Sequence, residues 1–206
     1  MAEADRPQLY LITPPALDLD VFPETLAAVL DATDIACIRL ALASRDEDAV
    51  ARAADAVRAV AHDRDVAVVI ENHLLLAERH GLDGIHLSDG SRGVRDARKA
   101  LGADAIVGAF CGSSRHDGIS AGESGADYVA FGPVGESALG KGEVAPKDLF
   151  AWWSEMIEVP VVAEGGLTEA LVRDLAPVTD FFGISSEIWG SDDPAKALMR
   201  LVAAMG

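Results

Sequence analysis

The sequence predicts a single-domain (β/α)8 TIM barrel that spans residues 1–206. Three observations predict it: eight short apolar runs, amphipathic stretches between them, and no linker or low-complexity segment along the chain. Eight alternating strand and helix units in one domain of this length are typical of a closed parallel barrel.

The eight apolar runs have the features of strands buried in a parallel sheet. They are short, rich in branched side chains, and bounded by Gly, Pro or Asp. In chain order, the predicted strands are 8–14, 35–42, 66–71, 84–87, 105–110, 128–134, 159–166 and 181–186.

The segments between these runs are candidate helices, for example 46–61 and 91–101. The last helix is expected within 192–205, with Asp193 as the N-cap and Pro194 as the first helical residue. An open doubly wound sheet is the alternative fold. Such a sheet usually has fewer strands and carries its glycine fingerprint after the first strand, whereas here the glycines follow strands seven and eight.

Composition and charge narrow the class of protein. The formal net charge is −17, which disfavours a nucleic-acid-binding surface and binding to an anionic membrane, because both need basic residues. Cys37 and Cys111 lie in or beside apolar runs, and we expect buried free thiols in a reducing compartment. The chain begins without the pattern of a signal peptide and has no apolar run long enough to span a membrane, so we expect a cytoplasmic protein.

Two adjacent glycines, Gly165 and Gly166, end the seventh predicted strand just before a helical pattern. Glycine lets the backbone adopt left-handed conformations and lets another group come close. The first N–H groups of a helix lack partners within it, so this junction could form a cradle for phosphate. The simpler interpretation is a tight turn with Thr168 as the helix N-cap.

Five segments follow the motifs of one known family in order and spacing. They are LYLITP (9–14), HGLDGIHLSD (80–89), GADYVAFGPVGESALGKG (125–142), VPVVAEGGL (159–167) and FFGISSEI (181–188). The last segment aligns with the family's strand-eight motif G-V-A-V-x-S-A-I, in which Ala stands at the position of Glu187. Together they resemble the thiamine phosphate synthases and the related thiazole tautomerases. The resemblance covers almost the whole chain, and it implies a (β/α)8 barrel.

The resemblance also implies a reaction and a phosphate site. In the family, hydroxyethylthiazole phosphate displaces pyrophosphate from hydroxymethylpyrimidine diphosphate to give thiamine phosphate. The thiazole phosphate sits on a double glycine, a strand-eight serine region and a T-x-T loop. These correspond here to Gly165, Gly166, Ser185, Ser186 and Ser137. We expect Gly165, Gly166, Ser185 and Ser186 to lie at the same C-terminal rim of the barrel.

The pyrophosphate half of the family pattern is degraded in this chain. The family's Q-x-R-x-K at the end of strand two reads RLALA over residues 39–43, so Arg39 stands at the Gln position and two cations are lost. Arg39 and Lys141, which corresponds to the family's loop lysine, are the candidate catalytic residues, and we expect both near the rim where the pyrophosphate would leave. Glu164 replaces the Ile that precedes the double glycine in the family's I-P-V-V-A-I-G-G-I, and we expect it to have a structural or substrate-sorting role.

The family's two metal-binding Asp positions read Asn72 and Ser91 in this chain. Glu71 and Asp89 are displaced from those positions and are the candidate ligands for Mg²⁺, which often needs only one or two carboxylates. The alternative is that these acids cap helices or face water.

The residues are compatible with three functions. The first is a thiamine phosphate synthase with a degraded pyrophosphate and metal half-site. The second is a tautomerase-like isomerase of a thiazole phosphate, and the third is a catalytically silent barrel that binds a phosphorylated ligand. The expected partner is a phosphorylated small-molecule substrate, with a homodimer left open, and no nucleic acid or membrane is expected.

Overall fold

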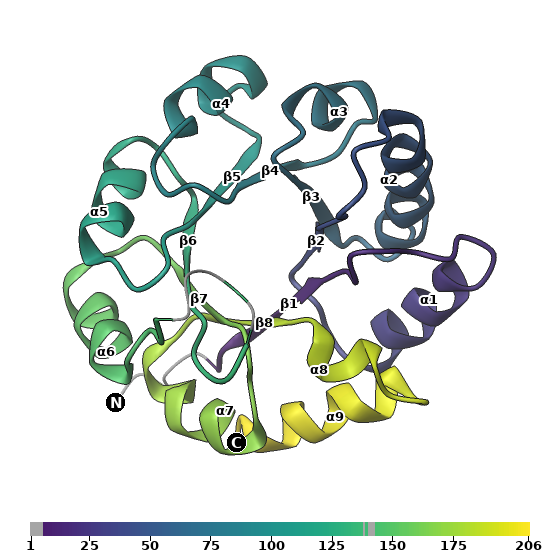
Figure 1. Ribbon diagram of the computed structural model, residues 1–206. Coiled ribbons are helices and arrows are strands. Elements are labelled where there is room, and N and C mark those ends of the chain that lie inside the picture. Colours follow the sequence, from purple (N-terminus) through teal and green to yellow (C-terminus); the bar gives the residue numbers. More distant parts are fainter. Residues whose placement is uncertain (1–5, 138, 140–142) are drawn as a thin grey trace.

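A computed structural model describes residues 6–137, 139 and 143–206. The chain forms a closed barrel of eight parallel strands with helices around the outside, which confirms the predicted fold (Figure 1). The strands are β1 (Gln8–Ile12), β2 (Cys37–Leu40), β3 (Ala67–Glu71), β4 (Gly84–Leu87), β5 (Ile106–Phe110), β6 (Tyr128–Phe131), β7 (Val161–Glu164) and β8 (Phe181–Ile184).

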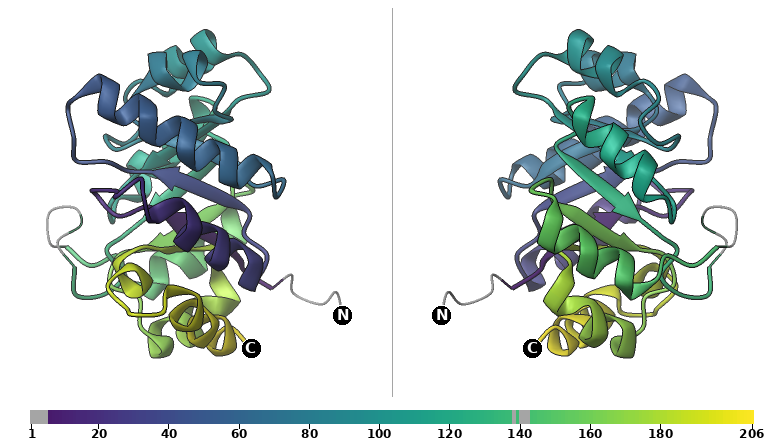
Figure 2. Two further views of the ribbon diagram at one scale, coloured as in Figure 1. Left: turned by 90° about the vertical axis from the view of Figure 1, so that its right-hand side faces the viewer. Right: turned by 90° about the vertical axis from the view of Figure 1, so that its left-hand side faces the viewer.

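The helices follow the strands in alternation and cover the outside of the barrel, as the two side views in Figure 2 show. They are α1 (Phe22–Ala32), α2 (Glu47–His62), α3 (Leu74–Arg79), α4 (Val94–Leu101), α5 (Arg115–Glu123), α6 (Lys147–Met156), α7 (Glu169–Leu175), the 3₁₀ turn η1 (Ala176–Val178), α8 (Ser186–Trp189) and α9 (Pro194–Ala204).

Two predicted helix starts are confirmed and one is wrong. The side chain of Asp46 caps α2, and the side chain of Asp193 caps α9 directly before Pro194. The helix predicted from residue 91 begins only at Val94, because Gly93 adopts a left-handed conformation with φ of 81°. Sequence periodicity places the helix but does not reveal that turn.

Each strand pairs with the next along the chain, and β8 closes the barrel on β1 through Gln8 and Phe181. Side chains alternate along each strand, so one set packs outward against the helices and the other fills the barrel. The apolar inner set is Tyr10, Ile12, Cys37, Val69, Tyr128, Ala130 and Val162.

Both cysteines are buried free thiols, as expected from the sequence. Among the helices that the structure describes, none is both long and apolar enough to cross a membrane.

Candidate active site

The carboxyl ends of the strands gather the predicted phosphate-binding residues at one rim of the barrel. Gly165 follows β7 directly, Ser185 follows β8 directly, and these two strands are hydrogen-bonded neighbours. The prediction that Gly165, Gly166, Ser185 and Ser186 share this rim is therefore confirmed. Ser137 lies in the loop after β6, where it is exposed and its hydroxyl accepts a hydrogen bond from the Leu139 amide at 3.2 Å.

The two adjacent glycines are needed for a close backbone approach. Gly165 and Gly166 have φ of 85° and 75°, and a Cβ on Gly166 would lie 2.7 Å from the carbonyl oxygen of Glu136. The amides of Val134 and Gly135 donate to the Gly165 carbonyl at 2.9 and 3.0 Å. The expected close approach is confirmed, but the group that approaches in this structure is the backbone of the loop after β6.

The simpler interpretation of this turn is confirmed as well. The hydroxyl of Thr168 accepts a hydrogen bond from the Leu171 amide at 3.2 Å, which makes Thr168 the N-cap of α7. Phosphate binding at this turn stays a prediction.

A residue that the sequence analysis did not single out bridges the turns after β7 and β8. The Oε1 atom of Glu187 accepts a hydrogen bond from the Leu167 amide at 3.0 Å, and its Oε2 atom accepts one from the Ser185 amide at 2.7 Å. A carboxylate therefore sits on backbone donors of both turns. The available signal was the strand-eight motif, which has Ala where FFGISSEI has Glu187.

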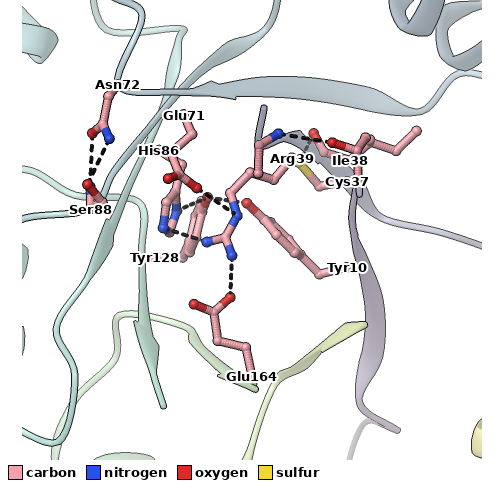
Figure 3. Close-up of polar contacts among 12 residues, drawn as sticks. Tyr10, Cys37, Ile38, Arg39, Glu71, Asn72, His86, Ser88, Tyr128 and Glu164 are labelled. Atoms are coloured by element: carbon pink, nitrogen blue, oxygen red, sulfur yellow. Dashed lines mark hydrogen bonds and ion pairs between the residues drawn. The ribbon is translucent and has the colours of Figure 1, made fainter. Parts of the chain in front are cut away.

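The guanidinium of Arg39 lies inside the barrel, where Figure 3 shows it between His86 and Glu164. Arg39 is only 4% exposed. Its Nη2 donates to Glu164 Oε2 at 2.7 Å, and its Nε lies 3.7 Å from Glu71 Oε2. We expected this cation at the rim, available to a pyrophosphate; it is instead held in the interior, because position 39 shares the inward face of β2 with Cys37.

A chain of hydrogen bonds continues from Arg39 deeper into the barrel (Figure 3). Arg39 Nη1 lies 2.5 Å from His86 Nε2, His86 Nδ1 lies 2.8 Å from the Tyr128 hydroxyl, and that hydroxyl lies 2.6 Å from the Tyr10 hydroxyl. Since a guanidinium only donates, His86 Nε2 accepts and Nδ1 carries the proton that it donates to Tyr128. Burial, with the charge of Arg39 in addition, lowers the pKa of His86 well below its ordinary value, so the imidazole is neutral.

Glu164 points into the barrel and away from the glycines that follow it. Burial raises the pKa of this carboxyl, while the neighbouring Arg39 acts in the opposite direction. Its Oε1 has no hydrogen-bond partner among the described residues. Gly183 on β8 makes room for the side chain, since a Cβ there would lie 2.8 Å from Glu164 Cβ. The expected structural role is thus supported by an ion pair with Arg39.

The side chains at and beside the positions of the family's metal-binding Asp residues do not form a metal site by themselves. Asn72 donates from Nδ2 to Ser88 Oγ at 2.7 Å and accepts from the Ser88 amide at 3.1 Å, so its amide group is engaged. Of the two candidate ligands, Glu71 lies beside Arg39 and Asp89 pairs with Arg92 at 2.6 Å. No cluster of three or more His, Cys, Asp or Glu side chains suited to a metal occurs in the part of the chain that the structure describes.

A cavity of about 320 Å³ opens at the same rim beyond β4, β5 and β6. Three of its lining residues are acidic: Asp89, Asp117 and Glu143. Phe110 and Cys111 also line it, and burial raises the pKa of the Cys111 thiol to about 12, so this group is not a nucleophile at neutral pH. An anionic substrate that enters here meets carboxylates. The candidate catalytic Lys141 lies outside the described residues.

Comparisons with known proteins agree with the barrel and its motifs. A family model described as thiamine monophosphate synthase matches residues 9–185. A relative from Rhodospirillum centenum, named thiamine-phosphate synthase, is 43% identical over 184 residues, which cover 88% of this chain and 89% of the relative. A second relative, a thiamine-phosphate synthase from Erythrobacter litoralis, is 38% identical over 216 residues, which cover 99% of this chain and 100% of the relative.

A solved structure, thiamine phosphate pyrophosphorylase from Pyrococcus furiosus, superimposes with a TM-score of 0.84. It covers 96% of this chain and 95% of its own, and at 20% identity the likeness supports the fold.

Proposed function

The chain belongs to the thiamine monophosphate synthase family, and we propose that it joins hydroxymethylpyrimidine diphosphate to hydroxyethylthiazole phosphate and releases pyrophosphate. The observation that carries this proposal is a family match that runs from β1 to the end of β8, with relatives of that name over nearly the whole chain. The enzyme is then a transferase of thiamine biosynthesis.

The two alternative functions are not favoured. The resemblance to thiazole tautomerases implies a catalytic His just beyond β5 for an isomerase of that type. This chain has Cys111 and Gly112 there. A catalytically silent barrel is not favoured either, because the relatives that cover the chain are named as synthases.

The proposed reaction requires positive charge at the site where the pyrophosphate leaves. A leaving pyrophosphate develops negative charge, and positively charged groups that contact it stabilise the transition state. Arg39 is already neutralised by Glu164, and the nearby cavity carries carboxylates. We therefore assign the main contact to Lys141 and expect weak turnover, below about 1 s⁻¹, the lower end of ordinary enzyme rates.

Phosphate binding by Gly165, Gly166, Ser185, Ser186 and Ser137 belongs to the same proposal. Its support is the family motif together with the shared rim of β7 and β8. Mg²⁺ enters the proposal as an ion carried by the diphosphate, with Glu71 and Asp89 as its only proposed protein ligands. The proposed compartment is the cytoplasm, and a homodimer is the assembly that a sizing measurement would test.

The experiment follows pyrophosphate release from both precursors by the purified protein. Release that requires both precursors and yields thiamine phosphate is the expected result, and its absence at any Mg²⁺ concentration would contradict the function. Lys141→Ala should abolish release. Lys147→Ala is the matched control, because Lys147 is a half-exposed lysine that pairs with Asp174 on the outer face of the barrel. Equal losses in both variants would contradict the role of Lys141.

A further inference from the structure

Glu187 lies where the proposed function needs the phosphate group of the acceptor substrate, hydroxyethylthiazole phosphate, to bind. Its two carboxylate oxygens accept hydrogen bonds from the amides of Leu167 and Ser185, at 3.0 and 2.7 Å. These donors belong to the turns after β7 and β8, the same turns that carry Gly165, Gly166 and Ser186. One side chain of the protein thus engages both turns from which a bound phosphate would take its hydrogen bonds.

A phosphate ester and this carboxylate would compete for the same positions. Each backbone N–H donates one strong hydrogen bond, and two anions on one pair of donors repel each other. The family motif has Ala at this position, so the carboxylate is a departure of this chain from that motif. Glu187 is half-buried, which leaves its side chain a route toward solvent.

We propose that the Glu187 carboxylate competes with the phosphate group of the acceptor for the Leu167 and Ser185 amides. The inference rests on the proposed function, since that function supplies the phosphate monoester. Binding of the acceptor then requires the Glu187 side chain to leave its two donors. The consequence is a weaker affinity for phosphate monoesters than the backbone of these turns would otherwise have.

A purely structural role for Glu187 makes a different prediction. Its bond to the amide of Ser185, the N-cap residue of α8, also resembles a capping interaction. If Glu187 only capped this short helix, its removal would lower stability and would leave phosphate affinity unchanged or weaker. Competition predicts the opposite sign, because removal frees two donors for the ligand.

The test measures inorganic phosphate binding by calorimetry at constant ionic strength. Glu187→Ala should bind phosphate at least about tenfold more tightly than the unaltered protein, since two charge-assisted hydrogen bonds no longer have to be broken first. Glu187→Gln keeps one acceptor oxygen and should be intermediate. Glu169→Ala is the matched control: it removes one exposed acid from the first turn of α7, and its effect should stay within about twofold, as screened surface charges act weakly.

Two results would overturn the proposal. One is equal phosphate affinity in Glu187→Ala and the unaltered protein, and the other is no phosphate binding by any variant. If Glu187→Ala does not fold, Glu187→Gln carries the same comparison. Pyrophosphate release is measured separately, so that tighter phosphate binding without turnover in any variant would count against the synthase function and leave the competition intact.

Discussion

The ion pair inside the barrel should show strong coupling between its two partners. Residues 39 and 164 depart from the family motifs together: Arg replaces Gln, and Glu replaces Ile. The relevant changes are Arg39→Gln, Glu164→Ile and the double variant that restores both motif residues. Arg39 Nη2 lies 2.7 Å from Glu164 Oε2 in the buried interior, so each single change leaves the other side chain buried without its ion-pair partner.

The two single variants should differ in cost. Glu164→Ile leaves a guanidinium that is 4% exposed, with Glu71 at 3.7 Å as its remaining acidic neighbour, and removing one partner of a buried pair costs about 3–5 kcal/mol. Arg39→Gln should cost less at low pH, because burial already raises the pKa of Glu164 and the stranded carboxyl can take up a proton. The Arg39 guanidinium cannot lose its charge in the same way, since arginine stays protonated at every accessible pH.

Urea unfolding followed by circular dichroism at pH 7.5 and pH 5 measures these differences. The double variant should lie within about 1.5 kcal/mol of the unaltered protein, the usual cost of a well-tolerated core exchange. The deficit of Arg39→Gln should shrink at the lower pH, while that of Glu164→Ile should not. Losses of the single variants that simply add in the double variant would refute the reasoning.

Three further measurements test other features. Because the pKa of His86 is lowered in the folded protein, the unfolded chain binds a proton below about pH 6.5 that the folded chain does not. The free energy of unfolding should therefore decrease by up to about 1.4 kcal/mol for each pH unit below this value, and His86→Gln should remove that decrease. Gly166→Ala should destabilise by at least about 1 kcal/mol more than Gly112→Ala, because both have positive φ but only Gly166 meets another backbone segment. Cys37 and Cys111, whose pKa values burial raises to about 12, should react with a thiol reagent at pH 8 only as fast as the protein unfolds; rapid labelling of the folded state would contradict their burial.

The fold could be predicted from the sequence because barrel strands and helices are encoded locally. Each strand is a short apolar run, and caps such as Asp46 and Asp193 mark the helix starts. The start of α4 was missed because the turn at Gly93 depends on a backbone conformation that periodicity does not encode.

The candidate site was less predictable because its key contacts join distant segments. The glycine pair indicated a close approach at Gly166, but not that the loop after β6 makes it. The inward face of β2 follows from alternation, yet nothing local in the sequence pairs Arg39 with Glu164, which is 125 residues away. Glu187 was visible as a departure from a motif, and only the folded chain brings its carboxylate to the Leu167 amide.

The polar chain through the interior also constrains how the strands can slide past one another. Tyr10, Arg39, His86, Tyr128 and Glu164 come from five different strands and are linked by directional hydrogen bonds. An apolar layer tolerates a shift of two residues along a strand as long as volume is conserved, since the same face stays inside. A directional chain does not, because one displaced strand would separate a donor from its acceptor. The interior of this barrel therefore helps to fix its shear, the stagger between strands that sets the tilt and diameter of a closed sheet.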